Sequence, residues 1–260
     1  MLVGDNKDQN IQNAVSMLQT ASNNGAQVAL LPEMFNCPYD SSLFSHYSET
    51  METGFTISEI SSSAKSLSMY IAAGSIPERN EDKLFNTCFV FNNKGQIIGR
   101  HRKTHLFDID IPSKITFKES DSLSAGNEIT IVDTEYCKIG IAICYDIRFP
   151  EFIRMAALKD AKLLLLPASF NMTTGPAHWE LLMRARALDN QLYVAAASPA
   201  RNENSSYVAY GNSILVDPWG SVISKADKEE KIIYGDIDLD LVERIRSELP
   251  LLKHLRKDIY

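Results

Sequence analysis

Cys144 has the clearest capacity for chemistry in this chain. It follows an apolar, β-branched run, Ile139 to Ile143, that predicts a buried strand, and Pro150 suits the first turn of a helix predicted at 150–158. Between a strand end and a helix start, backbone N–H groups and the helix dipole favour a thiolate. The same N–H groups, including that of Tyr145, can hold an oxyanion when the sulfur attacks a carbonyl. The alternative is that Cys144 is simply a small buried apolar residue.

A carboxylate and an ammonium group also lie just after predicted strands, as Cys144 does. Glu33 closes the predicted strand 28–31, and Lys103 follows the predicted strand 96–101. Because the carboxyl ends of strands converge on a crevice in layered α/β folds, we expect both groups to meet Cys144. Glu33 would then serve as general base and acid, Cys144 as the acylated nucleophile, and Lys103 as a charge beside the oxyanion. Taken singly, Glu33 and Lys103 are more typical of solvated charges.

Histidine offers a second candidate base. His101, His105 and His178 are available for a Cys–His enzyme such as a transferase, although each is more typical of a surface or structural residue. Spacing along the sequence does not separate Glu33 from a histidine in this role.

Composition limits the class of protein and its partners. The chain has 260 residues, 45% of them hydrophobic and 23% charged, with a net charge of −7. No Lys/Arg-rich run and no membrane-length apolar run occurs, so neither nucleic acid nor a membrane is an expected partner. The four cysteines form no CxxC pair, which argues against a zinc site or a disulfide framework and favours a reducing compartment. Without a signal-peptide pattern, we expect a cytoplasmic protein, or a mitochondrial one if a leader has been removed.

The predicted elements alternate between helices and strands, and hairpins recur. Each half has a helix, a short apolar strand closed by proline and then a hairpin, which favours two mixed sheets packed face to face in one domain, 1–260. Residues 103–127 are predicted to be irregular and residues 232–237 to form a strand. The predicted hairpins pair 85–91 with 96–101, 128–134 with 138–143, and 213–216 with 221–225.

Three segments together resemble the active-site motifs of a known family. They are Leu30-Leu-Pro-Glu-Met-Phe35, Arg102-Lys-Thr-His-Leu-Phe-Asp108 and Gly140-Ile-Ala-Ile-Cys-Tyr-Asp-Ile-Arg-Phe-Pro-Glu151. They are similar to the motifs of the nitrilase (carbon–nitrogen hydrolase) superfamily, and the resemblance covers nearly the whole chain. It implies an α/β fold, a four-layer α-β-β-α sandwich with mixed sheets.

The resemblance also implies the site residues. The family's Glu–Lys–Cys triad carries over onto Glu33, Lys103 and Cys144, and a second glutamate that lines the site matches Glu119. No cofactor or metal is implied, and a homodimer is the family habit. The family usually opens with a central strand before its first helix. Here Met1-Leu-Val-Gly leads almost directly into the first helix, so we expect that strand to be missing or truncated.

Within the superfamily the chain is most similar to the ω-amidases, which hydrolyse α-ketoglutaramate and α-ketosuccinamate to dicarboxylates and ammonia. The similarity is carried by Phe35-Asn-Cys-Pro-Tyr39, His105-Leu-Phe-Asp-Ile-Asp-Ile-Pro112, Lys114-Ile-Thr-Phe117, Phe170-Asn-Met-Thr-Thr-Gly-Pro-Ala-His-Trp-Glu180 and Ala197-Ser-Pro-Ala-Arg201. Hydrolysis of such substrates consumes water, and binding them requires a cation that pairs with the distal carboxylate. Arg148 is the candidate cation, Tyr39 a hydrogen-bond partner and Thr174 a weaker candidate.

Several alternatives remain open from the sequence. Arg148 could instead form a structural salt bridge with Asp146 or Glu151. A sister amidase that cleaves deaminated glutathione is the nearest functional alternative, followed by a true nitrilase. A binding or scaffold member that keeps the fold without turnover is the non-enzyme alternative.

Overall fold

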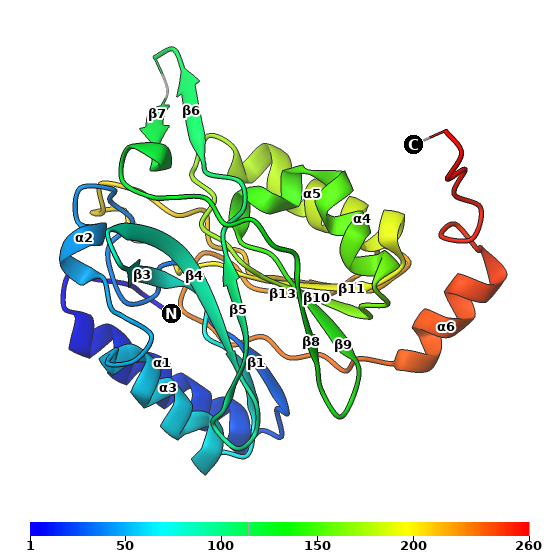
Figure 1. Cartoon of the computed structure of the whole chain (residues 1–260), viewed down its shortest axis with the longest axis horizontal. Helices are drawn as coiled ribbons and strands as arrows, with labels where there is room; N and C mark the ends of the chain where they lie inside the picture. The colour runs from blue at the N-terminus through cyan, green and yellow to red at the C-terminus, as the bar shows by residue number, and fades with distance from the viewer. Residues whose placement is uncertain (114, 260) are drawn as a thin grey trace.

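The computed structural model describes residues 1–113 and 115–259; Lys114 of the segment quoted above lies outside them. Two sheets face each other, with helices on both outer sides, which confirms the predicted four layers (Figure 1). None of the helices in the described chain is long and apolar enough to cross a membrane.

The first sheet is covered by the helices α1 (Lys7–Asn23) and α3 (Phe55–Ser66). Its longest strand, β4, alternates between two environments, as a strand buried on both faces must. Phe89 and Phe91 pack into the cluster with the helices, whereas Cys88 and Val90 pack into the cluster with the second sheet. The strands of this sheet are β1 (Val28–Leu30), β2 (Tyr70–Ala72), β3 (Ile76–Asn80), β4 (Lys83–Phe91) and β5 (Ile97–Arg102), and α2 (Phe44–Tyr47) lies in the connection before α3.

The second sheet is mixed, as predicted. Its central strands β9, β10 and β11 run parallel, and its outer strands pair antiparallel. The helices α4 (Pro150–Leu158) and α5 (Gly175–Asn190) pack on this sheet, and α4 begins at Pro150 as the sequence predicts. The strands are β8 (Thr130–Asp133), β9 (Lys138–Ile141), β10 (Leu163–Pro167), β11 (Tyr193–Ala197), β12 (Ile214–Val216) and β13 (Val222–Lys225).

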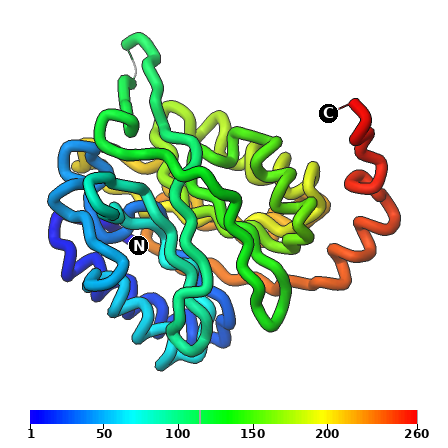
Figure 2. Tube along the Cα trace, in the orientation of Figure 1, coloured from blue at the N-terminus to red at the C-terminus, as the bar shows by residue number. Residues whose placement is uncertain are grey.

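Two predictions about secondary structure are wrong. Residues 103–127 are not wholly irregular, because β6 (Asp108–Ile111) and β7 (Ile115–Lys118) form a hairpin that projects from the sandwich (Figure 1). Its strands alternate apolar and polar residues, which is the pattern of a two-sided ribbon. Residues 232–237 form no strand, since they make no backbone hydrogen bond within the described chain. In Figure 2 this orange segment runs below the second sheet toward α6 (Leu239–Glu248).

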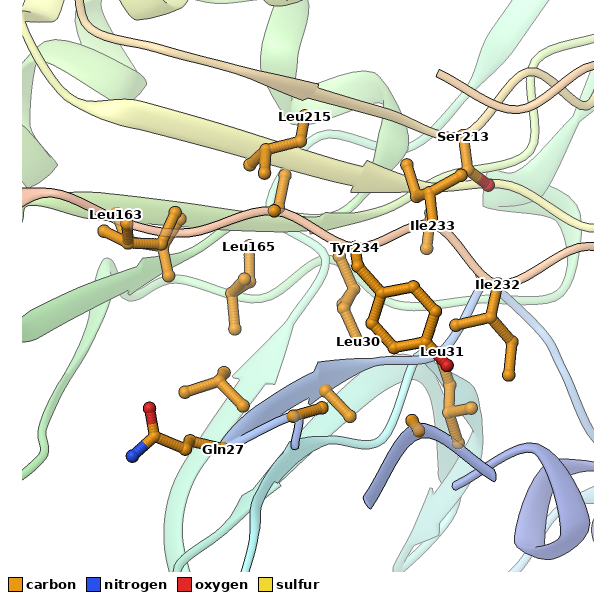
Figure 3. Close-up of a pocket in the computed structure, with 18 of the residues that line it drawn as sticks. Gln27, Leu30, Leu31, Leu163, Leu165, Ser213, Leu215, Ile232, Ile233 and Tyr234 are labelled. Carbon is orange, nitrogen blue, oxygen red and sulfur yellow. The ribbon is translucent and has the colours of Figure 1, made fainter. Parts of the chain in front are cut away.

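The same segment borders a groove between the sheets. β1 is the end strand of the first sheet, and among residues 1–113 and 115–259 its one strand partner is β2. A groove of about 510 Å³ separates β1 from residues 231–237 (Figure 3). Its apolar lining comes from both sheets and from the segment itself: Leu30, Leu31, Leu163, Leu165, Leu215, Ile232, Ile233 and Tyr234. Glu33, Lys103 and Cys144 do not line this groove.

Candidate active site

The structure brings Glu33, Lys103 and Cys144 together, each just beyond the end of its strand, β1, β5 or β9. Lys103 Nζ lies 2.9 Å from Glu33 Oε1, and both side chains are fully buried. Contact with the Cys144 thiol acts to lower the pKa of Glu33, so the two side chains are neighbours. The contact falls short of full hydrogen-bond geometry, since Glu33 Oε2 has no hydrogen-bond partner in the described chain. The predicted convergence at the carboxyl ends of strands is therefore confirmed.

Glu119 lies on the other side of the ammonium group. Lys103 Nζ is 2.9 Å from Glu119 Oε1, so the lysine bridges two buried carboxylates. Glu119 also accepts hydrogen bonds from the Tyr39 hydroxyl, at 2.6 Å, and from the Phe107 N–H, at 2.6 Å. These bonds fix Glu119 to the loop after β1, which carries Tyr39, and to the loop after β5, which carries Phe107. The geometry supports a role for Glu119 in orienting Lys103.

Two further residues of the site were not predicted. Asn86 on β4 donates from Nδ2 to Glu33 Oε1 at 2.9 Å. The Tyr207 ring packs at a tilt against Tyr39, with ring centroids 4.6 Å apart, and its hydroxyl donates to the Ser169 carbonyl at 2.6 Å. An asparagine inside the apolar run 85–91 was a signal that could have pointed to Asn86. Tyr207 lies in a loop, and the sequence offered no such signal.

The expectation of a stabilised thiolate is wrong. Burial raises the pKa of Cys144 well above its usual value, and the Glu33 carboxylate raises it further, while Lys103 opposes both. The nearest helix, α4, begins only at Pro150, and Cys144 instead opens a 3-10 turn, Cys144–Arg148. The sulfur therefore rests as a thiol and needs a base.

Glu33 and Lys103 have the charges that this chemistry requires. Burial raises the pKa of Glu33, and the Lys103 ammonium acts against that rise. Burial alone would lower the pKa of Lys103, but the carboxylates of Glu119 and Glu33 raise it above its usual value. Lys103 is thus a permanent cation, and Glu33 is a carboxylate whose proton affinity is increased by its surroundings.

When the Cys144 sulfur attacks a carbonyl group, the oxyanion that forms on the carbonyl oxygen would have two neighbours. One is the Lys103 ammonium, and the other is the Tyr145 N–H, which has no acceptor in the parts of the chain described. Cys144 itself has φ of 43°, in the left-handed region that residues other than glycine seldom adopt. Such strain persists only where surrounding contacts impose it.

The three histidines have other partners. His101 and His105 bond to Asp146, and His178 bonds to Arg148. The carboxylate that acts on the thiol is that of Glu33. The geometry therefore favours the Glu–Lys–Cys arrangement over a Cys–His enzyme.

Arg148 forms neither of the salt bridges considered as alternatives. The Asp146 carboxylate pairs with His101 and His105 instead, and no acidic side chain in residues 1–113 or 115–259 pairs with Arg148. The guanidinium lies 4.8 Å from the Phe170 ring centroid and contacts the His178 ring at 3.1 Å. Burial lowers the pKa of Arg148, and negative charge on the Cys144 sulfur would oppose that change. Arg148 ends the same 3-10 turn that Cys144 opens, which places it on the Cys144 side of the site.

Thr174 is placed differently. Its hydroxyl and its N–H both donate to Asn171 Oδ1, at 3.3 and 3.0 Å, at the start of α5. No hydrogen bond joins Thr174 to Arg148 or to the triad in the described chain. It stays a weak candidate for substrate contact.

The fold and the comparisons with known proteins together define an amide hydrolase. A family model for carbon–nitrogen hydrolases matches residues 5–247, and the chain belongs to that family. "Nitrilase homolog 2" of Dictyostelium discoideum is 51% identical over 262 residues, covering 100% of this chain and 80% of the relative. "Omega-amidase NIT2" of Bos taurus is 50% identical over 254 residues, covering 98% of this chain and 92% of the relative. Among solved structures, Nit3 of Saccharomyces cerevisiae superposes with a TM-score of 0.90 at 39% identity, covering 98% of this chain and 93% of its own.

Proposed function

We propose that this protein is an ω-amidase, which hydrolyses the side-chain amide of small keto dicarboxylate monoamides such as α-ketoglutaramate and α-ketosuccinamate. The observation that carries the proposal is Arg148, a half-buried guanidinium near Cys144 without an acidic partner in the described chain. A monoamide of a dicarboxylic acid supplies the missing carboxylate at one end and the scissile amide at the other. The relatives named as omega-amidases, about half identical over nearly the whole chain, support the same activity.

The proposed reaction begins with attack by sulfur. Glu33 accepts the proton of Cys144 as the sulfur bonds to the amide carbon, and the carbonyl oxygen becomes an oxyanion beside Lys103 and the Tyr145 N–H. Collapse of this intermediate breaks the C–N bond, and Glu33 returns the proton to the leaving amine, so ammonia departs and a thioester remains.

Water completes the cycle. Glu33 takes a proton from the water, whose oxygen attacks the thioester carbon, and collapse of the second intermediate returns Cys144 as a thiol and releases the carboxylic acid. Glu119 accepts from Tyr39 and holds Lys103 throughout, so its role in this scheme is to orient the ammonium group. Glu33 and Cys144 supply every proton transfer, and the only co-reactant is water.

The aromatic rings beside the triad support a small substrate. Tyr39 lies against Tyr207 and Phe117, with ring centroids 4.6 and 5.5 Å apart, so aromatic rings flank the triad. These rings confine the acyl chain between the nucleophile and Arg148. A longer substrate such as deaminated glutathione would need additional space beside them.

The test is ammonia release from α-ketoglutaramate, measured beside deaminated glutathione and a simple nitrile. We expect turnover of the keto-amide, no turnover by Cys144→Ala, and a KM about tenfold to 100-fold higher in Arg148→Met, because a charge-assisted contact is lost. Propionamide, which lacks the distal carboxylate, serves as the matched substrate and should not distinguish Arg148→Met from the native protein. Preference for the glutathione derivative or the nitrile would overturn the proposal, as would a folded protein with no turnover.

We further propose a homodimer and a cytoplasmic or mitochondrial location. Four apolar side chains on the packed helices α4 and α5 are exposed, which supports a buried interface there: Met155, Leu158, Leu181 and Leu188. Light scattering would give the molar mass, and a monomer at all concentrations would refute the dimer. Cell fractionation would identify the compartment.

A further inference from the structure

Asp146 is a buried carboxylate that the proposed reaction does not use, yet it accepts four hydrogen bonds. Its Oδ1 accepts from the N–H and from Nδ1 of His105, at 2.9 and 2.8 Å. Its Oδ2 accepts from the Ile143 N–H at 2.9 Å and from His101 Nε2 at 3.1 Å. The side chain is 0% exposed, so water cannot substitute for these donors.

The donors come from the two segments that carry the ammonium group and the thiol. His101 precedes Lys103 by two residues, and His105 follows it by two. Ile143 directly precedes Cys144, and Asp146 follows Cys144 by two. One carboxylate therefore connects both flanks of Lys103 with both flanks of Cys144.

The turn at Cys144 needs such a connection. Cys144 has φ of 43°, a conformation that is held only when neighbouring groups impose it. The Asp146 N–H donates to the Ile143 carbonyl at 3.0 Å while the Asp146 side chain accepts from the Ile143 N–H, so the turn is closed on both sides of Cys144. Without the carboxylate the Ile143 N–H would lose its acceptor in the interior.

The Asp146 carboxylate is charged throughout the working range of pH. Burial acts to raise its pKa, but the hydrogen bonds from His101 and His105 outweigh burial and hold the pKa well below its usual range. As an anion with only acceptor sites, Asp146 requires that His101 Nε2 and His105 Nδ1 carry protons. His105 is further fixed by stacking on Phe149, with ring centroids 3.7 Å apart.

We propose that Asp146 is a positioning residue, which holds the Cys144 sulfur at its place relative to Lys103 and Glu33 by accepting from His101, His105 and Ile143 at once. The inference rests on the proposed role of Cys144 as nucleophile. It also gives the two histidines a function that is not acid–base chemistry. A misplacement of about 1 Å at a reacting atom can cost on the order of 100-fold in rate.

The test compares Asp146→Asn with the native protein. The amide has one acceptor oxygen in place of two, so half of the four donors lose their acceptor while the shape of the side chain is kept. We expect kcat to fall about 10-fold to 100-fold with KM changed by less than about threefold. The reason is that the substitution displaces the nucleophile and leaves the substrate contacts in place. Alkylation of Cys144 by iodoacetamide, followed by peptide mass mapping, should slow by a similar factor.

Glu49→Gln is the matched control. Glu49 is also a buried carboxylate that accepts from a backbone N–H, that of Thr56 at 2.9 Å, and from the Thr56 hydroxyl at 2.6 Å, but no hydrogen bond or ion pair joins it to the triad in the described chain. Both variants should unfold at lower temperature than the native protein. Only Asp146→Asn should change kcat and the alkylation rate when both are assayed well below their unfolding temperatures.

Two milder variants keep the test decisive if Asp146→Asn does not fold. His101→Gln and His105→Gln each disturb one side-chain contact to Asp146, and each should show a smaller loss of kcat in the same direction. A folded Asp146→Asn with native kcat and native alkylation would overturn the inference, and so would a rise in KM alone. Alkylation does not depend on the choice of amide, so it separates a failure of this inference from a failure of the proposed substrate.

Discussion

Replacing Lys103 by Met tests the charge balance of the site. Lys103 Nζ lies 2.9 Å from carboxylate oxygens of Glu33 and Glu119, and all three side chains are 0% exposed. Met has a similar length but no charge, so two buried carboxylates would face each other without a cation. Removal of one partner from a buried ion pair costs about 3–5 kcal/mol. In a chain of this length that corresponds to a fall of about 6–20 °C in the unfolding temperature.

The same substitution should make stability depend on pH. In Lys103→Met, burial and mutual repulsion raise the pKa of Glu33 beyond the increase that burial already causes. A carboxyl group with a raised pKa in the folded state takes up a proton on folding. Its contribution to stability is therefore present at low pH and is lost as pH rises through the folded-state pKa. The loss relative to the native protein should be larger at pH 8 than at pH 5.

Thermal unfolding followed by circular dichroism at both pH values measures these quantities. The double variant Lys103→Met with Glu119→Gln removes one of the two charges and should recover part of the loss at pH 8. Equal unfolding temperatures for Lys103→Met and the native protein at pH 8 would refute the argument, because the three groups would then not form an ionic cluster in the folded state.

Three further predictions follow from the same structure. Glu33→Gln should lower kcat by about 10²–10⁴, measured by ammonia release, because the Cys144 thiol then lacks its base; native kcat would contradict this. The acidic limb of kcat/KM against pH should lie above the pH at which an ordinary glutamate titrates, since burial raises the pKa of Glu33; a limb near pH 4 would contradict it. Met1 lines the groove beside β1. An apolar extension of about eight residues added before Met1 should pair with β1 and raise the unfolding temperature. A Gly/Ser extension of equal length is the control and should leave the unfolding temperature unchanged.

The meeting of Glu33, Lys103 and Cys144 could be predicted from strand ends, whereas the choice of Glu33 over a histidine as the base came from the resemblance to a known family. Glu33, Lys103 and Cys144 each come just after a strand that the apolar pattern identifies, and parallel strands present their carboxyl ends to one crevice. The four-layer arrangement was likewise predictable from alternating helices and strands with recurring hairpins. These inferences depend on local sequence and on general packing rules.

Other features depend on contacts that the sequence does not encode locally. Tyr207 reaches the site through a loop, and the raised pKa of Cys144 arises from burial and from Glu33, a residue distant in the chain. The segment 232–237 has the composition of a strand, but a strand forms only beside a partner with free backbone groups, and none pairs with it in the described chain. The hairpin of β6 and β7, by contrast, had a readable alternating pattern.

The groove beside β1 also affects how the protein behaves in solution. An end strand with unpaired N–H and C=O groups next to exposed apolar side chains is a template for other extended chains. Tyr234 is 42% exposed at this groove, so the surface is accessible to them. Pairing of β1 with a second copy of the chain would grow with concentration, so changes at this strand edge would alter solubility and yield during expression. Chaperones that recognise extended apolar segments would meet the folded protein here, at a site remote from its chemistry.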